Sequence, residues 1–134
     1  MNKQDEQINQ LNSMVKMRIA PSPIHGVGIF ATRKILQGEK LYAANFPQPF
    51  RIPMGSMDKL FPEVKALILE RWPQIVNGSA FMWPDTNHQA YCNHSDNPNY
   101  DANLDIAIRD IDVGEEITEN YKLIPGHDVV FSWL

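Results

Sequence analysis

Short segments in which apolar and polar residues alternate dominate the first third of the chain and predict β-strands. Apolar side chains occupy every second position at Val15, Met17 and Ile19, which is typical of a half-buried strand over residues 15–20. Prolines between residues 47 and 53 favour extended edge segments over helix. Further strand-like patterns are found over residues 27–32, 40–44, 104–109 and 116–118.

One segment has helical periodicity instead. Between residues 56 and 72, apolar side chains recur every three or four positions and share one predicted face, which consists of Val64, Leu67, Ile68 and Trp72. We expect Ser56 to cap the N-terminus of this segment and Pro73 to end it. Because proline is tolerated in a first helical turn but not inside a helix, Pro62 is expected to divide the segment into two pieces.

These patterns predict a mainly β domain of short, non-uniform strands. Residues 1–13 are rich in polar side chains and are expected to form a flexible N-terminal tail or a short surface helix. Residues 14–134 are then one domain, which is long enough to bury a single hydrophobic core. Residues 46–82, with the helical segment, form the insert in this arrangement.

Composition narrows the function classes. The net charge of −4 argues against broad nucleic-acid binding but leaves room for a basic peptide as partner. The single cysteine, Cys92, excludes an internal disulfide. No apolar run approaches the roughly 20 residues that span a bilayer, and the polar N-terminus does not resemble a signal peptide. We therefore expect an intracellular protein, cytoplasmic in general and nuclear if its source is eukaryotic or viral.

Three patterns in the sequence suggest binding sites that the surrounding residues do not support. The spacing Gly26-x-Gly28-x-x-Ala31 fits a loose dinucleotide fingerprint, but prolines precede it and a strand pattern follows, where a βαβ unit is required. His88, Cys92 and His94 could offer three zinc ligands, although no fourth ligand accompanies them. The oxygen-bearing side chains at alternate positions of 99–105 lack the glycine and glutamate of a calcium loop. No metal site is expected.

Three motifs, in this order, carry a resemblance to a known family. They are His-Gly-Val-Gly at 25–28, Asn-His-Ser-Asp-Asn-Pro-Asn at 93–99, and Gly-Glu-Glu-Ile-Thr at 114–118 followed by Tyr121. Together they resemble the SET-domain protein-lysine methyltransferases, and the resemblance runs from about Met17 to the C-terminus. It implies a β-clip-like fold of several short sheets, with a knot-like C-terminal crossing and one inserted helical segment.

The resemblance also implies a cofactor and a set of site residues. The cofactor is S-adenosyl-L-methionine, and the partner is a protein or peptide substrate with an exposed lysine. Tyr121 takes the place of the catalytic tyrosine, whose hydroxyl would orient the methyl group and the amine. Asn93 and His94 would contact the cofactor, and an aromatic side chain near the C-terminus, Phe131 in preference to Trp133, would pack on its adenine. The remaining cofactor contacts would come mainly from the main chain of His25, Gly26, Val27 and Gly28.

The chain departs from the family pattern in ways that affect these expectations. Cysteines that bind zinc after the core in many members are missing, so residues 129–134 or a second subunit of a homodimer would have to complete the substrate channel. Glu119 replaces an aromatic residue two positions before Tyr121, where it could attract a cationic lysine or face solvent. Glu115 and Glu116 could pass for a general-base pair, but a turn and an exposed edge are expected. A catalytically inactive SET-fold binding module is the alternative function.

Overall fold

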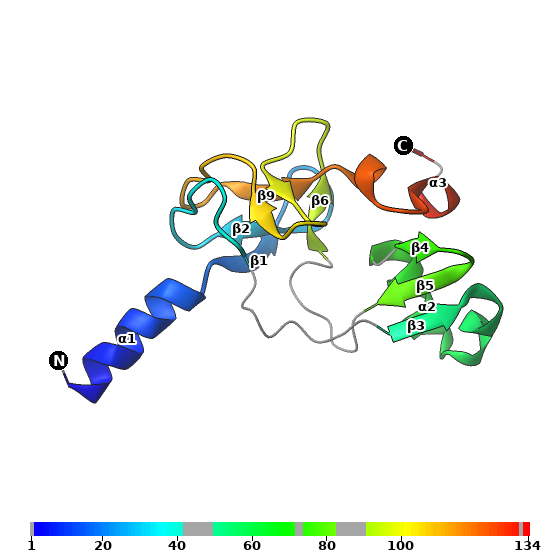
Figure 1. The fold of residues 1–134 in the computed structure, drawn as a ribbon, viewed down its shortest axis with the longest axis horizontal. Helices are drawn as coiled ribbons and strands as arrows, with labels where there is room; N and C mark the ends of the chain where they lie inside the picture. The colour runs from blue at the N-terminus through cyan, green and yellow to red at the C-terminus, as the bar shows by residue number, and fades with distance from the viewer. Residues whose placement is uncertain (1, 42–49, 72–73, 83–90, 132) are drawn as a thin grey trace.

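The computed structural model describes residues 2–41, 50–71, 74–82, 91–131 and 133–134, and its main body is a four-stranded sheet. The strand order is β1 (Met17–Pro21), β2 (Val27–Ala31), β9 (Glu116–Glu119) and β6 (Asn93–His94). β1, β2 and β9 are antiparallel neighbours, whereas β6 runs parallel to β9. Figure 1 shows that this sheet places β1 and β2, from the early part of the chain, beside β9, from its last quarter. The mainly β prediction is confirmed, and β1 and β2 lie close to their predicted positions.

The main core packs against the centre of this sheet. Ile29 of β2 and Ile117 of β9 are paired in register, and both are fully buried. Ile35 and Ile111 form an isolated bridge and are also fully buried in the same core. The motif strands β2 and β9 are therefore fixed by apolar packing, with about 1.5–3 kcal/mol gained for each such side chain removed from water.

The inserted segment forms a second, smaller unit around Met57, Ile68 and Ala80. A sheet of order β3 (Phe50–Pro53), β5 (Ser79–Met82) and β4 (Ile75–Val76) packs with the 3₁₀ helix η1 (Met54–Lys59) and helix α2 (Pro62–Arg71). β3 is an edge strand, as the prolines predicted.

The helical prediction for the insert is correct in outline and wrong at its start. Pro62 begins α2, so the predicted division of the segment is confirmed. Ser56 is not a cap, because it lies inside η1, where Pro53 is the N-cap residue without a side-chain hydrogen bond. On the predicted apolar face Ile68 is buried, but Val64 is 40% exposed. Trp72 and Pro73 lie outside the described residues.

The C-terminal segment joins the two units. Tyr121–Leu123 form the 3₁₀ turn η3, and His127–Val130 form helix α3, which lies near the small sheet in Figure 1. The Ile75 N–H of β4 donates to the Pro125 carbonyl at 2.8 Å. Gly126 has φ +79°, and a Cβ there would lie 2.6 Å from the Ile75 carbonyl oxygen. Only glycine allows this close approach without strain.

Other predicted elements are shorter than expected or lie elsewhere. Lys40 forms only an isolated bridge with Ile106, and most of the predicted strand over 40–44 lies outside the described residues. The strand predicted over 104–109 is reduced to β8 (Ile106–Ala107), paired with β7 (Tyr100–Asp101). The knot-like crossing stays a prediction.

The N-terminal segment forms helix α1 (Lys3–Met14), which projects from the body and buries no residue, so the short surface helix is the alternative that is observed (Figure 1). No helix within the described ranges combines the length and apolar character that crossing a membrane requires.

Candidate functional site

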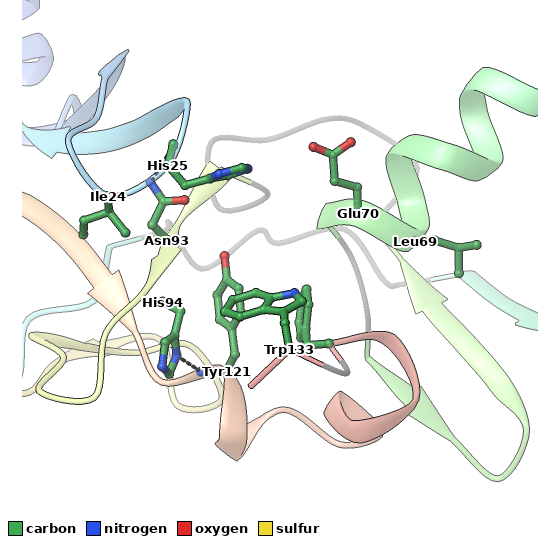
Figure 2. A pocket seen from close by; sticks show the side chains of 9 residues that line it. Ile24, His25, Leu69, Glu70, Asn93, His94, Tyr121 and Trp133 are labelled. Carbon is green, nitrogen blue, oxygen red and sulfur yellow. Dashed lines mark hydrogen bonds between the residues drawn. The ribbon is translucent and has the colours of Figure 1, made fainter.

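A pocket of about 470 Å³ opens where the turn before β2, strand β6, the C-terminal segment and the end of α2 meet (Figure 2). Its volume lies within the range of small-molecule sites, about 300–1,000 Å³. The pocket combines apolar, aromatic and hydrogen-bonding side chains from four distant parts of the sequence. They are Ile24, His25, Leu69, Glu70, Asn93, His94, Tyr121, Phe131 and Trp133.

Asn93 lies on β6 and is buried, and its side-chain amide nitrogen points toward the turn before β2. Nδ2 lies 3.0 Å from the Val27 carbonyl and from Glu116 Oε2, and 3.2 Å from the His25 carbonyl and from Ser22 Oγ. Because these neighbours include three pure acceptors, the amide cannot be turned round without opposing acceptor to acceptor. In Figure 2 the amide oxygen points the other way, toward the space above Tyr121. Asn93 thus holds the turn and offers an acceptor to the pocket.

His94 is fixed in one tautomer by its two neighbours. Its Nδ1 accepts the Tyr121 backbone N–H at 3.0 Å, so Nδ1 carries no proton. Nε2 lies 3.1 Å from Asp96 Oδ1 and is therefore the nitrogen that donates. The ring is held 5.3 Å from the ring of Tyr121. The imidazole consequently fixes the backbone at Tyr121, and its ring forms part of the pocket wall.

Tyr121 begins η3 directly after β9, and its hydroxyl group rises into the pocket in Figure 2. The hydroxyl donates to the Cys92 carbonyl at 2.5 Å. The ring of Phe131 stacks on the ring of Tyr121 at 4.6 Å, and Trp133 packs edge-on to both rings. A hydroxyl and a main-chain carbonyl are thus held side by side within an aromatic wall. π faces of this kind attract cations, and they also stack on flat heterocycles.

Six of the residues predicted from the sequence line the pocket together: His25, Asn93, His94, Tyr121, Phe131 and Trp133. Gly26, Val27 and Gly28 do not line it. The Val27 carbonyl is bound to Asn93, and a Cβ on Gly28 would lie 2.3 Å from Glu116 Oε2. Gly28 therefore leaves room for a protein side chain, and its main-chain contact with a cofactor stays a prediction.

Sequence reasoning missed Ile24, Leu69 and Glu70 as lining residues. Leu69 and Glu70 belong to the inserted helix, whose predicted apolar face did not include them. Only the packing of the insert against the C-terminal segment brings them to the pocket, and no motif in the sequence carries that information.

The two acidic residues of β9 are more buried than expected from the sequence. Solvent exposure was one alternative for Glu119, and an exposed edge was expected for Glu116. Glu119 is 8% exposed, so the solvent-facing alternative is wrong. Burial raises the pKa of Glu119 to about 8, Asp101 adds to the rise, and the Cys92 thiol opposes it. Glu116 is half-buried on an inner strand and accepts hydrogen bonds from Ser22 and Asn93, so the exposed edge expected there is also wrong.

No cluster of three His, Cys, Asp or Glu side chains suited to a metal ion is found among the described residues. His88 lies outside the described residues. Burial raises the pKa of the Cys92 thiol, which disfavours the thiolate that a zinc ligand requires.

Comparisons with known proteins fit this geometry. The family model described as SET domain matches residues 26–122. A Plasmodium falciparum protein, provisionally described as a histone methyltransferase, shares the fold with a TM-score of 0.50 and 19% identity, over 79% of this chain and 92% of that one. A humanized mutant of the Chaetomium thermophilum Polycomb Repressive Complex 2, bound to the inhibitor GSK126, gives a TM-score of 0.54 and 21% identity. That match covers 84% of this chain and 16% of the other. No curated protein matches the sequence significantly.

Proposed function

Because the chain belongs to the SET-domain family, whose members are generally methyltransferases, we propose that it transfers a methyl group from S-adenosylmethionine to a lysine side chain of a protein substrate. The single observation that carries the proposal is the placement of the Tyr121 hydroxyl in a pocket with Asn93 and His94. Three motifs that are far apart in the sequence meet there.

The size and the lining residues of the pocket support the proposed cofactor. S-adenosylmethionine carries an ammonium group, a flat adenine and a positively charged sulfonium, which supplies the methyl group when the cofactor is bound. The Asn93 amide oxygen is an acceptor suited to the ammonium group. The aromatic wall of Phe131, Tyr121 and Trp133 offers π surface to the adenine and to the sulfonium.

Methyl transfer requires positioning more than acid–base power. A bond forms between the lysine nitrogen and the methyl carbon while the bond from carbon to sulfur breaks, and sulfur keeps the electron pair. The nitrogen loses one proton to solvent in the process. The protein therefore has to hold an uncharged amine in line with the methyl group and exclude water. The Tyr121 hydroxyl and the Cys92 carbonyl, 2.5 Å apart, provide polar atoms for that alignment.

We further propose that the substrate is a basic segment of a protein. The chain has a net charge of −4, and an acidic surface attracts cationic peptides. Glu70 also contributes a carboxylate to the pocket lining.

The direct test is calorimetric titration of the purified protein with S-adenosylmethionine, together with a labelled-methyl assay on histones and on cell lysate. Tyr121→Phe removes only the hydroxyl group and keeps the ring that stacks on Phe131. We expect this variant to bind the cofactor within about threefold of the wild type and to lose about 10²-fold or more in methyl transfer, since positioning is the main source of rate here.

Each outcome of this test has a defined meaning. Labelling by the wild type that is unchanged in Tyr121→Phe would contradict the role of the hydroxyl. Cofactor binding without labelling of any protein would favour the alternative, a catalytically inactive binding module. Absence of cofactor binding would refute the proposed function.

A further inference from the structure

Glu116 does not line the pocket, yet it touches two of the elements that shape the site. Ser22 Oγ lies 2.8 Å from each oxygen of the Glu116 carboxylate. The Asn93 amide nitrogen lies 3.0 Å from Oε2. Ser22 in turn accepts the Ile24 backbone N–H at 3.0 Å, so the carboxylate is connected to the turn that carries Ile24 and His25.

We propose that Glu116 is a positioning residue of the cofactor site, which holds the Asn93 amide and the turn of residues 22–26 in the orientation that a cationic cofactor needs. The inference rests on the proposed function. It adds a residue outside the pocket lining that sets the direction of the Asn93 dipole and, through Ser22, the place of the turn.

The carboxylate controls the direction of the Asn93 amide because an ionised carboxylate can only accept hydrogen bonds. Glu116 therefore attracts the amide nitrogen of Asn93 and leaves the amide oxygen for the pocket. A glutamine at position 116 could place its own NH₂ group against the Asn93 NH₂, and the two donors would repel each other. The Val27 and His25 carbonyls would then be the remaining pure acceptors at the Asn93 amide nitrogen, and the acceptor that Asn93 offers to the pocket would be less firmly fixed.

The space for this contact is created by Gly28. A Cβ at Gly28 would lie 2.3 Å from Glu116 Oε2, which is closer than the two atoms can approach, and 3.0 Å from Asn93 Nδ2. Glycine at this position thus lets the carboxylate reach under the turn. Gly28, the second glycine of the motif, therefore leaves room for the contact between the Glu116 carboxylate and the Asn93 amide. In this proposal Glu116 affects the cofactor through its effect on Asn93.

Charge adds to the effect of geometry. Within the described part of the chain, the hydrogen-bond partners of the Glu116 carboxylate are the neutral side chains of Ser22 and Asn93, and no Lys, Arg or His forms an ion pair with it. A half-buried negative charge without a cationic partner favours a positively charged ligand nearby. The arrangement suits a ligand that carries both an ammonium and a sulfonium group.

The test compares Glu116→Gln with a matched control, Glu115→Gln. Glu115 is the adjacent carboxylate and also accepts a hydrogen bond from an asparagine amide, that of Asn99 at 2.9 Å, but it has no hydrogen bond to the turn of residues 22–26 among the described residues. We expect Glu116→Gln to weaken S-adenosylmethionine binding about tenfold or more, the effect of losing hydrogen bonds to a charged group. Glu115→Gln should bind the cofactor within about twofold of the wild type, because neither Glu115 nor its partners Asn99 and Asp112 line the pocket.

A purely structural role would not produce the kinetic pattern that we expect. Glu116→Gln should raise the KM for the cofactor by the same factor while kcat at saturating cofactor stays within about threefold, because the lost interaction acts on binding. Ser22→Ala removes one hydroxyl from the turn and should weaken cofactor binding about threefold to tenfold, which keeps the idea testable if Glu116→Gln fails to fold.

The outcomes separate this inference from the proposed function. If the wild type binds the cofactor and both Glu116→Gln and Ser22→Ala bind equally well, the positioning role is refuted and the proposed function stands. If Glu115→Gln weakens cofactor binding as much as Glu116→Gln, the loss comes from a general disturbance of the segment that follows the turn at Gly114. The positioning role of Glu116 is then refuted as well. If the wild type does not bind the cofactor, the proposed function fails and this inference fails with it.

Discussion

Glu119 should make the stability of the protein fall as the pH rises, and Glu119→Gln should remove that dependence. The side chain is buried, and its pKa rises from 4.5 to about 8 chiefly through burial. Oε2 has no hydrogen-bond partner among the described residues. Removing a charge from water without such compensation is costly, so the folded state favours the protonated acid.

The magnitude follows from the difference between the two pKa values. Each pKa difference of one corresponds to about 1.4 kcal/mol, so the span from 4.5 to about 8 amounts to about 5 kcal/mol. Because the folded pKa is raised, the penalty is absent below pH 4.5, grows as the pH rises toward 8, and is constant above that value. A domain of this size has only about 5–15 kcal/mol of total stability, so the penalty is large.

The assay is urea unfolding, followed by tryptophan fluorescence at about pH 5, 7 and 9, which span the titration. The substituted glutamine places an amide donor where Oε2 has no partner, so the variant should be about 1–3 kcal/mol less stable than the wild type at the lowest pH. At the highest pH the order should reverse, and the variant should be the more stable protein by a few kcal/mol. Glu63→Gln, an exposed change on α2, should leave the free energy of unfolding within about 0.5 kcal/mol at each pH. Parallel pH profiles for wild type and Glu119→Gln would refute the reasoning.

Three further predictions concern stability. Phe131→Ala should cost about 3–5 kcal/mol in urea unfolding, because the ring is 6% exposed and stacks in the aromatic wall, whereas Phe131→Leu should cost less than half of that. Gly38→Ala should cost about 1–2 kcal/mol for its φ of +83° alone, and Gly126→Ala should lower the thermal midpoint further, because its Cβ would also meet the backbone of β4. The hydrogen bond from Arg33 lowers the pKa of Glu39 to about 2, so the stabilising effect of this carboxylate is present above pH 4.5 and is lost as the pH falls toward 2. Glu39→Gln should therefore make the free energy of unfolding depend less on pH between 4.5 and 2.

The features that could be predicted from the sequence are those set by local chemistry. β1 and β2 follow from alternation and from the prolines and glycines around them, and their observed bounds differ from the predicted ones by about two residues at most. The division at Pro62 follows from the missing N–H of proline. The site residues of the three motifs were identified from the resemblance, and the structure brings His25, Asn93 and Tyr121 into one pocket.

The features that could not be predicted depend on contacts between distant segments. Ser56 has the chemistry of a helix cap, but tertiary packing places it inside the 3₁₀ helix that begins at Met54. Glu70 reaches the pocket only because the insert packs against the C-terminal turn at Gly126. Neither feature leaves a periodic pattern in the sequence. The position of Ser56 depends on a local choice between two helix types, and that of Glu70 depends on residues far away along the chain.

The acidic residues of β9 show this limit most clearly. A strand with glutamates at both of its ends has the pattern of an exposed edge, and alternation alone would place one face in water. β9 instead lies between β2 and β6, so neither of its edges is free. Glu119 shares the side of the fully buried Ile117, whereas Glu116 lies on the opposite side, under the turn before β2. Glu116 is half-buried against Asn93, and its proposed role there is to orient that amide. For Glu119 the cost of burial predicts a stability that changes with pH. The two glutamates can therefore be tested independently, one by cofactor affinity and the other by the pH dependence of unfolding.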